Sequence, residues 1–92
     1  MNIELLSSKY IASAEEVLKN LKCSKTPINL TTETVSNILD WATNYLEDAK
    51  YYKAQGKFET SLTSVAYCEG LLDALKLIGA VEFEWPKKQE SY

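Results

Sequence analysis

The sequence predicts an all-α fold, a small three-helix bundle with helices near residues 3–22, 32–55 and 59–78 and an extended C-terminal arm. A chain of 92 residues suits one small domain. Apolar residues recur at spacings of three and four in three separate segments, which is the period of an α-helix. The 3 Gly and 2 Pro are too few for the many turns of an all-β fold. We expect residues 1–85 to form one helical domain and residues 86–92 to form a flexible tail.

The first helix is predicted by an apolar stripe that leaves most charged residues outside it. The stripe consists of Ile3, Leu6, Tyr10, Ala14, Val17 and Leu21, widened by Ile11 and Leu18. A hairpin of the other two helices could not bury its own apolar surface, so we expect the first helix to cover it.

The second helix follows a linker, residues 23–32, in which Pro27 disfavours helix. Thr31 is the expected N-cap, because its hydroxyl can accept a hydrogen bond from a free amide of the first turn. The apolar stripe consists of Val35, Ile38, Ala42, Tyr45, Ala49 and Tyr52. Gly56 then supplies the residue type that accepts the left-handed conformation just beyond a helix.

The third helix should begin near Glu59 and end near Ile78, with Gly79 directly beyond it. The short connection at Gly56 predicts an antiparallel hairpin with the second helix. The apolar stripe consists of Leu62, Val65, Cys68 (or Ala66), Leu72, Leu75 and Ile78. Gly70 costs about 1 kcal/mol relative to Ala in mid-helix, and we expect it to allow a close approach of the second helix.

The arm alternates apolar and charged residues, with Val81, Phe83 and Trp85 set against Glu82 and Glu84. This is the period of a strand or of an extended segment. A single strand has no partner in a helical bundle. The arm is therefore expected either to pack back on the helices or to pair with another chain.

The composition argues against nucleic-acid binding and against most catalytic mechanisms. The net charge is −3 and the isoelectric point about 4.9, whereas a nucleic-acid surface needs a basic face. All ten basic residues are Lys, so the chain has no guanidinium for bidentate contacts. The absence of His removes the commonest general base and metal ligand. We expect neither enzymatic activity nor a cofactor.

The location expected from the sequence is cytoplasmic. No apolar run approaches the ~18 residues of a membrane span, and the N-terminus lacks the pattern of a signal peptide. We therefore expect no membrane contact. The two cysteines, Cys23 and Cys68, do not indicate a disulfide framework in such a chain.

Residues 45–79 carry a pattern of helix, Gly-x-Phe turn and second helix containing Tyr, a small residue, Glu-Gly and Leu-Asp-Ala. This pattern resembles a small archaeal helical family known as domain of unknown function 357. The matching residues are Tyr45, Leu46, Asp48, Ala49, Tyr52, Gly56, Phe58, Ala66, Tyr67, Glu69, Gly70, Leu71, Leu72, Asp73 and Ala74. Ser61 and Cys68 stand where the family usually has Ala, which implies slightly different packing. The resemblance implies a helical bundle from an archaeal source and implies no activity.

Four carboxylates on the second and third helices form a possible cation site. They are Glu47, Asp48, Glu69 and Asp73. Carboxylates gathered from two helices could hold Mg²⁺ or Mn²⁺. The sequence favours a solvated acidic face with neighbouring lysines, because metal sites in helical bundles normally include His.

Five aromatic side chains exceed what so small a core needs. They are Trp41, Tyr51, Tyr67, Phe83 and Trp85. Aromatic residues are enriched at interface hot spots, so we predict a protein interface here. The expected function is a non-enzymatic interaction module, either a small accessory subunit of a larger archaeal assembly or a homodimer. Two alternatives stay open: a metal-binding or small-molecule-binding bundle, and an accessory factor in DNA replication or repair that acts through protein contacts.

Overall fold

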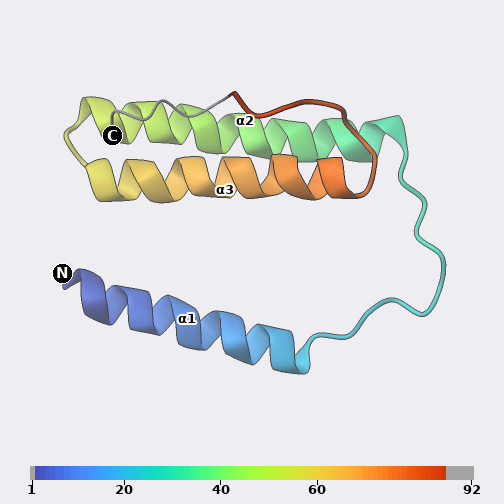
Figure 1. Cartoon of the computed structure of the whole chain (residues 1–92), viewed down its shortest axis with the longest axis horizontal. Helices are drawn as coiled ribbons and strands as arrows, with labels where there is room; N and C mark the ends of the chain where they lie inside the picture. Colours follow the sequence, from blue (N-terminus) through green and yellow to red (C-terminus); the bar gives the residue numbers. More distant parts are fainter. Residues whose placement is uncertain (1, 87–92) are drawn as a thin grey trace.

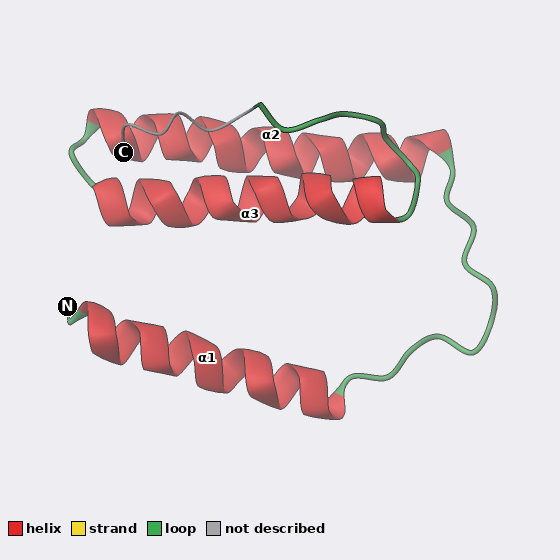
Figure 2. Ribbon diagram, in the orientation of Figure 1, coloured by secondary structure: helices red, strands yellow, loops and turns green. Residues whose placement is uncertain are grey.

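The computed structural model describes residues 2–86 and contains three helices (Figures 1 and 2). They are α1 (Ile3–Asn20), α2 (Thr32–Ala54) and α3 (Phe58–Leu77). No strand occurs within these described residues, so the arm is not a β-strand. The all-α prediction is confirmed, and every helix end lies within two residues of the expected position. The predicted tail lies outside the described residues, apart from Pro86.

α2 and α3 form an antiparallel hairpin closed at Gly56 (Figure 1). Gly56 has φ +74°, the left-handed conformation expected of it. The Lys57 amide donates to the Tyr52 carbonyl at 2.9 Å, and the Gly56 amide donates to the Lys53 carbonyl at 3.0 Å. These two bonds form a Schellman motif and satisfy carbonyls at the end of α2. Gly79, with φ +78°, ends α3 in the same way.

Polar side chains fix two other helix ends. The hydroxyl of Thr31 accepts the Thr34 amide at 3.1 Å, which confirms the predicted N-cap of α2. α1 ends at Asn20, two residues earlier than predicted. There the Asn20 side chain donates to the Glu16 carbonyl at 3.0 Å, and the backbone turns extended at Leu21. Such local side-chain bonds compete with continuation of the helix.

The core lies between α2 and α3. Its buried residues are Ala42, Ala49, Cys68 and Leu75. The two alanines let the helix backbones approach closely, and the Ser61 hydroxyl donates to the Ala49 carbonyl at 2.7 Å. The buried stripe of α3 therefore begins at Ser61. The prediction that it begins at Leu62 is wrong, because that side chain is exposed one position around the helix.

α1 runs alongside the hairpin but stands apart from it (Figure 1). Within residues 2–86, no Cα atom of α1 comes within 8 Å of one in α2 or α3. None of its described side chains is buried. The expectation that the first helix covers the hairpin is therefore not met in this arrangement, in which the backbone turns extended at Leu21 and α1 makes no close contact with α2 or α3.

The arm folds back over the hairpin, as one of the two alternatives for residues 81–85 predicts (Figure 1). The Trp85 indole donates from Nε1 to Oδ1 of Asp73 at 2.7 Å. Phe83 meets the Trp85 ring edge-to-face at 5.0 Å between centroids, and the Lys76 ammonium lies 4.9 Å from the Phe83 centroid. These contacts fasten the arm to α3.

Candidate functional site

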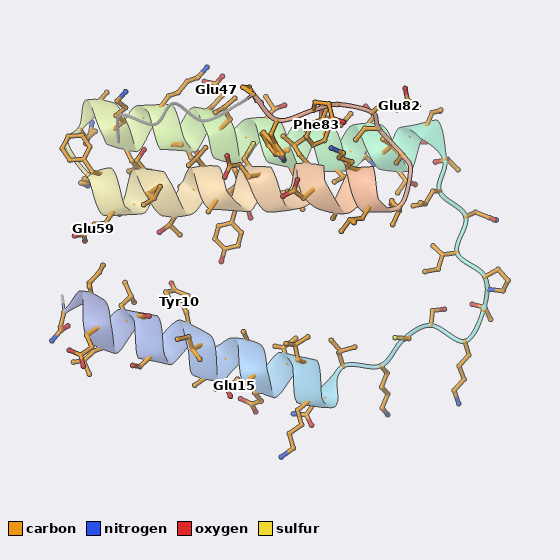
Figure 3. All side chains as sticks on the ribbon, in the orientation of Figure 1. Tyr10, Glu15, Glu47, Glu59, Glu82 and Phe83 are labelled. Carbon is orange, nitrogen blue, oxygen red and sulfur yellow. The ribbon has the colours of Figure 1, made fainter. Side chains whose placement is uncertain are left out.

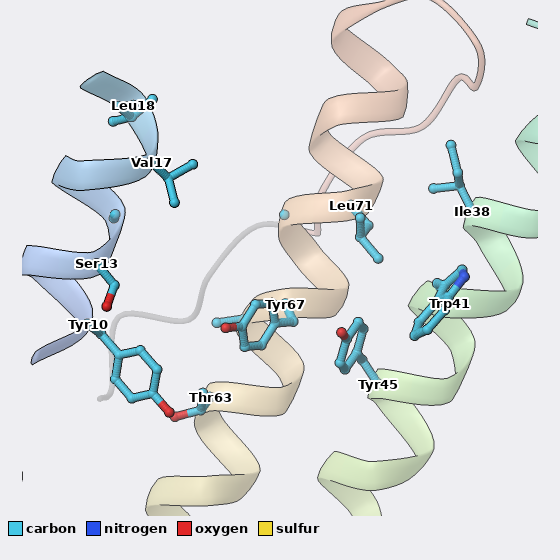
Figure 4. A pocket seen from close by; sticks show the side chains of 13 residues that line it. Tyr10, Ser13, Val17, Leu18, Ile38, Trp41, Tyr45, Thr63, Tyr67 and Leu71 are labelled. Carbon is cyan, nitrogen blue, oxygen red and sulfur yellow. The ribbon is translucent and has the colours of Figure 1, made fainter. Parts of the chain in front are cut away.

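A large apolar groove lies between α1 and the hairpin and has a volume of about 1140 Å³ (Figure 4). α1 contributes Tyr10, Ser13, Ala14, Val17 and Leu18; α2 contributes Ile38, Trp41 and Tyr45; α3 contributes Thr63, Ala66, Tyr67, Gly70 and Leu71. None of these described lining residues is charged. A concave surface of this composition suits an apolar ligand surface.

Three neighbouring aromatic rings, of which two are stacked, form the hairpin side of the groove. Tyr45 and Tyr67 stack across the two helices with centroids 5.1 Å apart and planes inclined by 19°. Trp41 lies 6.2 Å from Tyr45 on the same helix. Trp41 remains 62% exposed and Tyr67 53% exposed. The rings therefore contact one another on the hairpin and leave part of their surface exposed in the groove.

α1 turns its apolar stripe toward these rings. Figure 3 shows Tyr10 projecting from α1 toward the hairpin and Glu15 lying on the opposite side. Figure 4 shows Val17 and Tyr10 directed at the groove from α1, facing Tyr67 on α3. Two apolar faces thus oppose each other without closing.

Gly70 lines the groove and does not serve the close helix approach predicted for it. A Cβ atom placed on Gly70 would meet nothing within 4 Å, so α2 does not fill the space beside it. That prediction is wrong, because Gly70 lies on the groove side of α3 and not on the buried side with Cys68 and Leu75. The loss of helix stability caused by Gly70 is therefore not offset by closer packing between α2 and α3.

The five aromatic residues predicted at a protein interface, those of the arm as a second contact, lie in three places. Trp41 and Tyr67 lie in the groove. Tyr51 is near the hairpin turn, where it packs edge-to-face on Tyr52 at 5.4 Å. Phe83 and Trp85 lie with the arm, on the side of Lys76. Lys76 follows Tyr67 by nine positions, about two and a half helical turns, and therefore lies on the opposite face of α3.

The groove also contains residues that sequence reasoning did not assign to a site. Tyr45 was expected in the core, and Tyr10, Ala14 and Val17 were expected under the hairpin. Their apolar periodicity was visible in the sequence. A periodic stripe identifies a face to be covered but not what covers it.

The four carboxylates of the predicted cation site do not come together. Within residues 2–86, no three potential metal ligands are close enough to hold an ion. The hairpin register explains this, because Ser61 lies level with Ala49. Asp73 is then roughly 15 Å further along α3 than the level of Asp48. Asp73 accepts the Trp85 indole at 2.7 Å, and Glu47 pairs with Lys50 at 3.4 Å.

The two cysteines differ in their surroundings. Cys68 is buried in the core, whereas Cys23 is exposed in the linker. Burial raises the pKa of the Cys68 thiol, and the neighbouring Glu69 charge raises it further. The Cys68 thiol is therefore a packing group and a weak nucleophile.

Comparisons with known proteins place the chain in a family without adding an activity. Among the described residues, no helix is long and apolar enough to cross a bilayer. Searches among curated proteins and among solved structures found no match. One family, described as "Protein of unknown function (DUF357)", matches residues 9–81, most of α1 and the whole hairpin. The chain therefore belongs to the DUF357 family.

Proposed function

We propose that the chain is a non-enzymatic helical interaction module whose groove docks an apolar helix face of a partner protein. The observation that carries the proposal is the charge-free groove of about 1140 Å³ with the exposed Trp41 and Tyr67 rings in it. Rigid aromatic side chains supply large contact area at low entropic cost, which makes them frequent hot spots.

The shape of the groove favours a helix over an extended peptide. Its walls are helices, and the described residues that line it offer no row of free backbone donors such as a strand partner requires. The hairpin wall extends from Ile38 to Tyr45 on α2 and from Thr63 to Leu71 on α3, about two turns of each helix. A partner helix of about two to three turns would cover it.

The amount of exposed surface supports a binding role. The chain exposes 8371 Å². A folded monomer of 10.4 kDa is expected to expose about 5400 Å². The excess, on the order of 3000 Å², arises largely because α1 and its linker stand apart from the hairpin. Apolar surface on the hairpin is thereby left for a partner that contributes the ~800 Å² of a standard interface.

The proposal is tested with two tyrosines of similar exposure. Tyr67 is 53% exposed in the groove, and Tyr51 is 59% exposed near the hairpin turn. Tagged wild type, Tyr67→Asp and Tyr51→Asp are used to capture proteins from the source lysate, and each is also analysed by sedimentation velocity. We expect stoichiometric association, with another protein or with a second copy, that is lost in Tyr67→Asp and kept in Tyr51→Asp.

Thermal unfolding followed by circular dichroism provides the folding control, because both variants should keep the cooperative transition of the α2–α3 hairpin. The proposal fails if the wild type forms no stoichiometric complex of either kind. It also fails if Tyr51→Asp abolishes association as strongly as Tyr67→Asp.

A further inference from the structure

We infer that α1 is a tethered competitor for the hairpin wall of the groove, the face that carries Trp41, Tyr45 and Tyr67, and that the partner helix carries a stripe of the same chemistry as α1. In this account α1 closes on the hairpin of its own chain, and a partner must displace it to bind. The inference rests on the proposed function, since it specifies the partner and the regulation of the same groove.

The first support is that α1 lacks the packing from which helices in proteins gain most of their stability. It has 18 residues, and none of its described side chains is buried. Most of the stability of a helix in a protein comes from packing of its amphipathic face rather than from helix propensity. Within residues 2–86, the unpartnered apolar face opposite α1 is the groove side of the hairpin.

The second support is that the two faces match in chemistry. α1 presents Tyr10, Ser13, Ala14 and Val17, and the hairpin presents its aromatic rings beside Ala66 and Gly70. Small residues on both sides allow the helix backbones to approach. A docked helix would fill the open space beside Gly70, which the hairpin itself does not fill.

The third support is electrostatic. The chain carries a net charge of −3, yet no described residue that lines either wall is charged. Docking of α1 on the hairpin therefore desolvates no charged side chain of the lining. A charged helix face, by contrast, would lose its hydration without gaining an opposite charge. A partner stripe must accordingly be uncharged, with a small residue where its backbone meets Gly70.

The fourth support is the tether. The segment between Asn20 and Thr32, residues 21–31, is exposed throughout. Eleven extended residues span at most roughly 36–40 Å, enough for α1 to close on the hairpin or to leave it. A short flexible tether gives an effective concentration in the millimolar range. For a groove that binds such a helix with a dissociation constant of about 0.1 mM, the closed form would outnumber the open form roughly tenfold.

The test adds a synthetic peptide of residues 2–21 to the full chain. Val17→Asp places a charge in the α1 stripe and should release the tethered helix. Ala12→Asp places the same charge on the other side of α1 and is the matched control. Affinity is measured by fluorescence anisotropy of the labelled peptide.

We expect the Val17→Asp chain to bind the peptide about tenfold more tightly than the wild type and the Ala12→Asp chain. The double variant Val17→Asp, Tyr67→Asp should not bind it. Equal affinity for all three chains would overturn competition by α1. Absence of binding to the Val17→Asp chain would overturn α1 as an occupant of the groove.

The outcome is separable from that of the proposed function. Suppose that the peptide fails to bind while Tyr67→Asp still abolishes capture of a partner. The groove then remains an interface, and only the role of α1 is lost. A concentration-dependent dimer in sedimentation, abolished by Val17→Asp, would assign the α1 contact to a second copy and overturn intramolecular closure.

Discussion

Tyr45 of α2 and Tyr67 of α3 stack with their ring centroids 5.1 Å apart, and this pair joins the two helices at the surface of the groove. The stack belongs both to the hairpin and to the site. The half-buried Tyr45 ring stabilises the packing of the helices, and the Tyr67 ring, which is 53% exposed, presents more of its surface to the groove. Substitutions at the two positions should therefore separate stability from binding.

Tyr45→Leu should lower the free energy of unfolding by about 1 kcal/mol. The change keeps an apolar side chain but removes the ring pair, which contributes about 0.5–1.5 kcal/mol beyond burial. Urea denaturation followed by circular dichroism measures the change. Tyr45→Phe, which keeps the ring, is the control, and an equal loss in both variants would show that the stack contributes nothing.

Gly70→Ala should affect stability and docking in opposite directions. In the structure a Cβ atom at Gly70 meets nothing within 4 Å, and in the Val17→Asp chain α1 is expected to leave that space free. The free energy of unfolding should rise by up to about 1 kcal/mol, because Ala is the better helix former. Affinity for the peptide of residues 2–21 should fall, because the Cβ occupies space that the docked helix needs.

Gly56→Ala is the comparison for that variant. Its φ of +74° is unfavourable for a residue with a Cβ, so the free energy of unfolding should fall by about 1 kcal/mol. A fall of the same size in Gly70→Ala, with peptide affinity unchanged, would contradict the position assigned to Gly70.

Asp73→Ala should release Trp85 from α3. The indole loses its acceptor, and a hydrogen bond of this kind contributes about 0.5–1.5 kcal/mol. In a Trp41→Phe background, Trp85 is the only fluorophore of its type, and its emission should shift to the red. Glu84→Gln removes only the exposed 3.7 Å pair with Lys76 and should leave the emission unchanged. Identical spectra for both variants would show that Asp73 does not hold the arm.

Cys68 should make stability fall at alkaline pH. Its pKa is raised in the folded state, so the folded protein holds the thiol proton more tightly than the unfolded chain does. This contribution is complete below the ordinary thiol pKa of about 8.5 and is lost as pH rises through the raised value. Between pH 8 and pH 10 the free energy of unfolding should therefore fall more in the wild type than in Cys68→Ala. Parallel pH profiles would refute this assignment.

Millimolar Mg²⁺ or Mn²⁺ should leave the melting temperature unchanged. A bound ion stabilises a fold by mass action, but the described carboxylates do not gather into a site of three ligands. Differential scanning fluorimetry with Ca²⁺ as a further control measures this. A saturable rise that Asp48→Asn or Glu69→Gln removes would restore the cation site.

The sequence allowed the helix ends to be predicted because each depends on local chemistry. The Thr31 hydroxyl and the positive φ of Gly56 and Gly79 act within one helical turn. Which residues of α3 face α2 could not be predicted from local chemistry. Ser61 is polar, and it lies in the buried stripe only because its hydroxyl reaches the Ala49 carbonyl of the other helix.

The site was only partly predictable for a similar reason. Trp41 and Tyr67 were singled out by their number and type, but their grouping with Tyr45 depends on the hairpin register. Phe83 and Trp85 carry the same chemistry and lie with the arm instead. The open groove depends on the distance between α1 and the hairpin, and periodicity contains no information about that distance.

Amide hydrogen exchange of α1 tests the central claim most directly. The account predicts that α1 amides in the monomeric wild type exchange more slowly than those of an unfolded chain, because the helix spends most of its time on the hairpin. Tyr67→Asp should abolish that protection while α2 and α3 keep theirs, and Tyr51→Asp should leave it intact. Exchange of α1 at the unfolded rate in the wild type, or protection that survives Tyr67→Asp, would contradict the account.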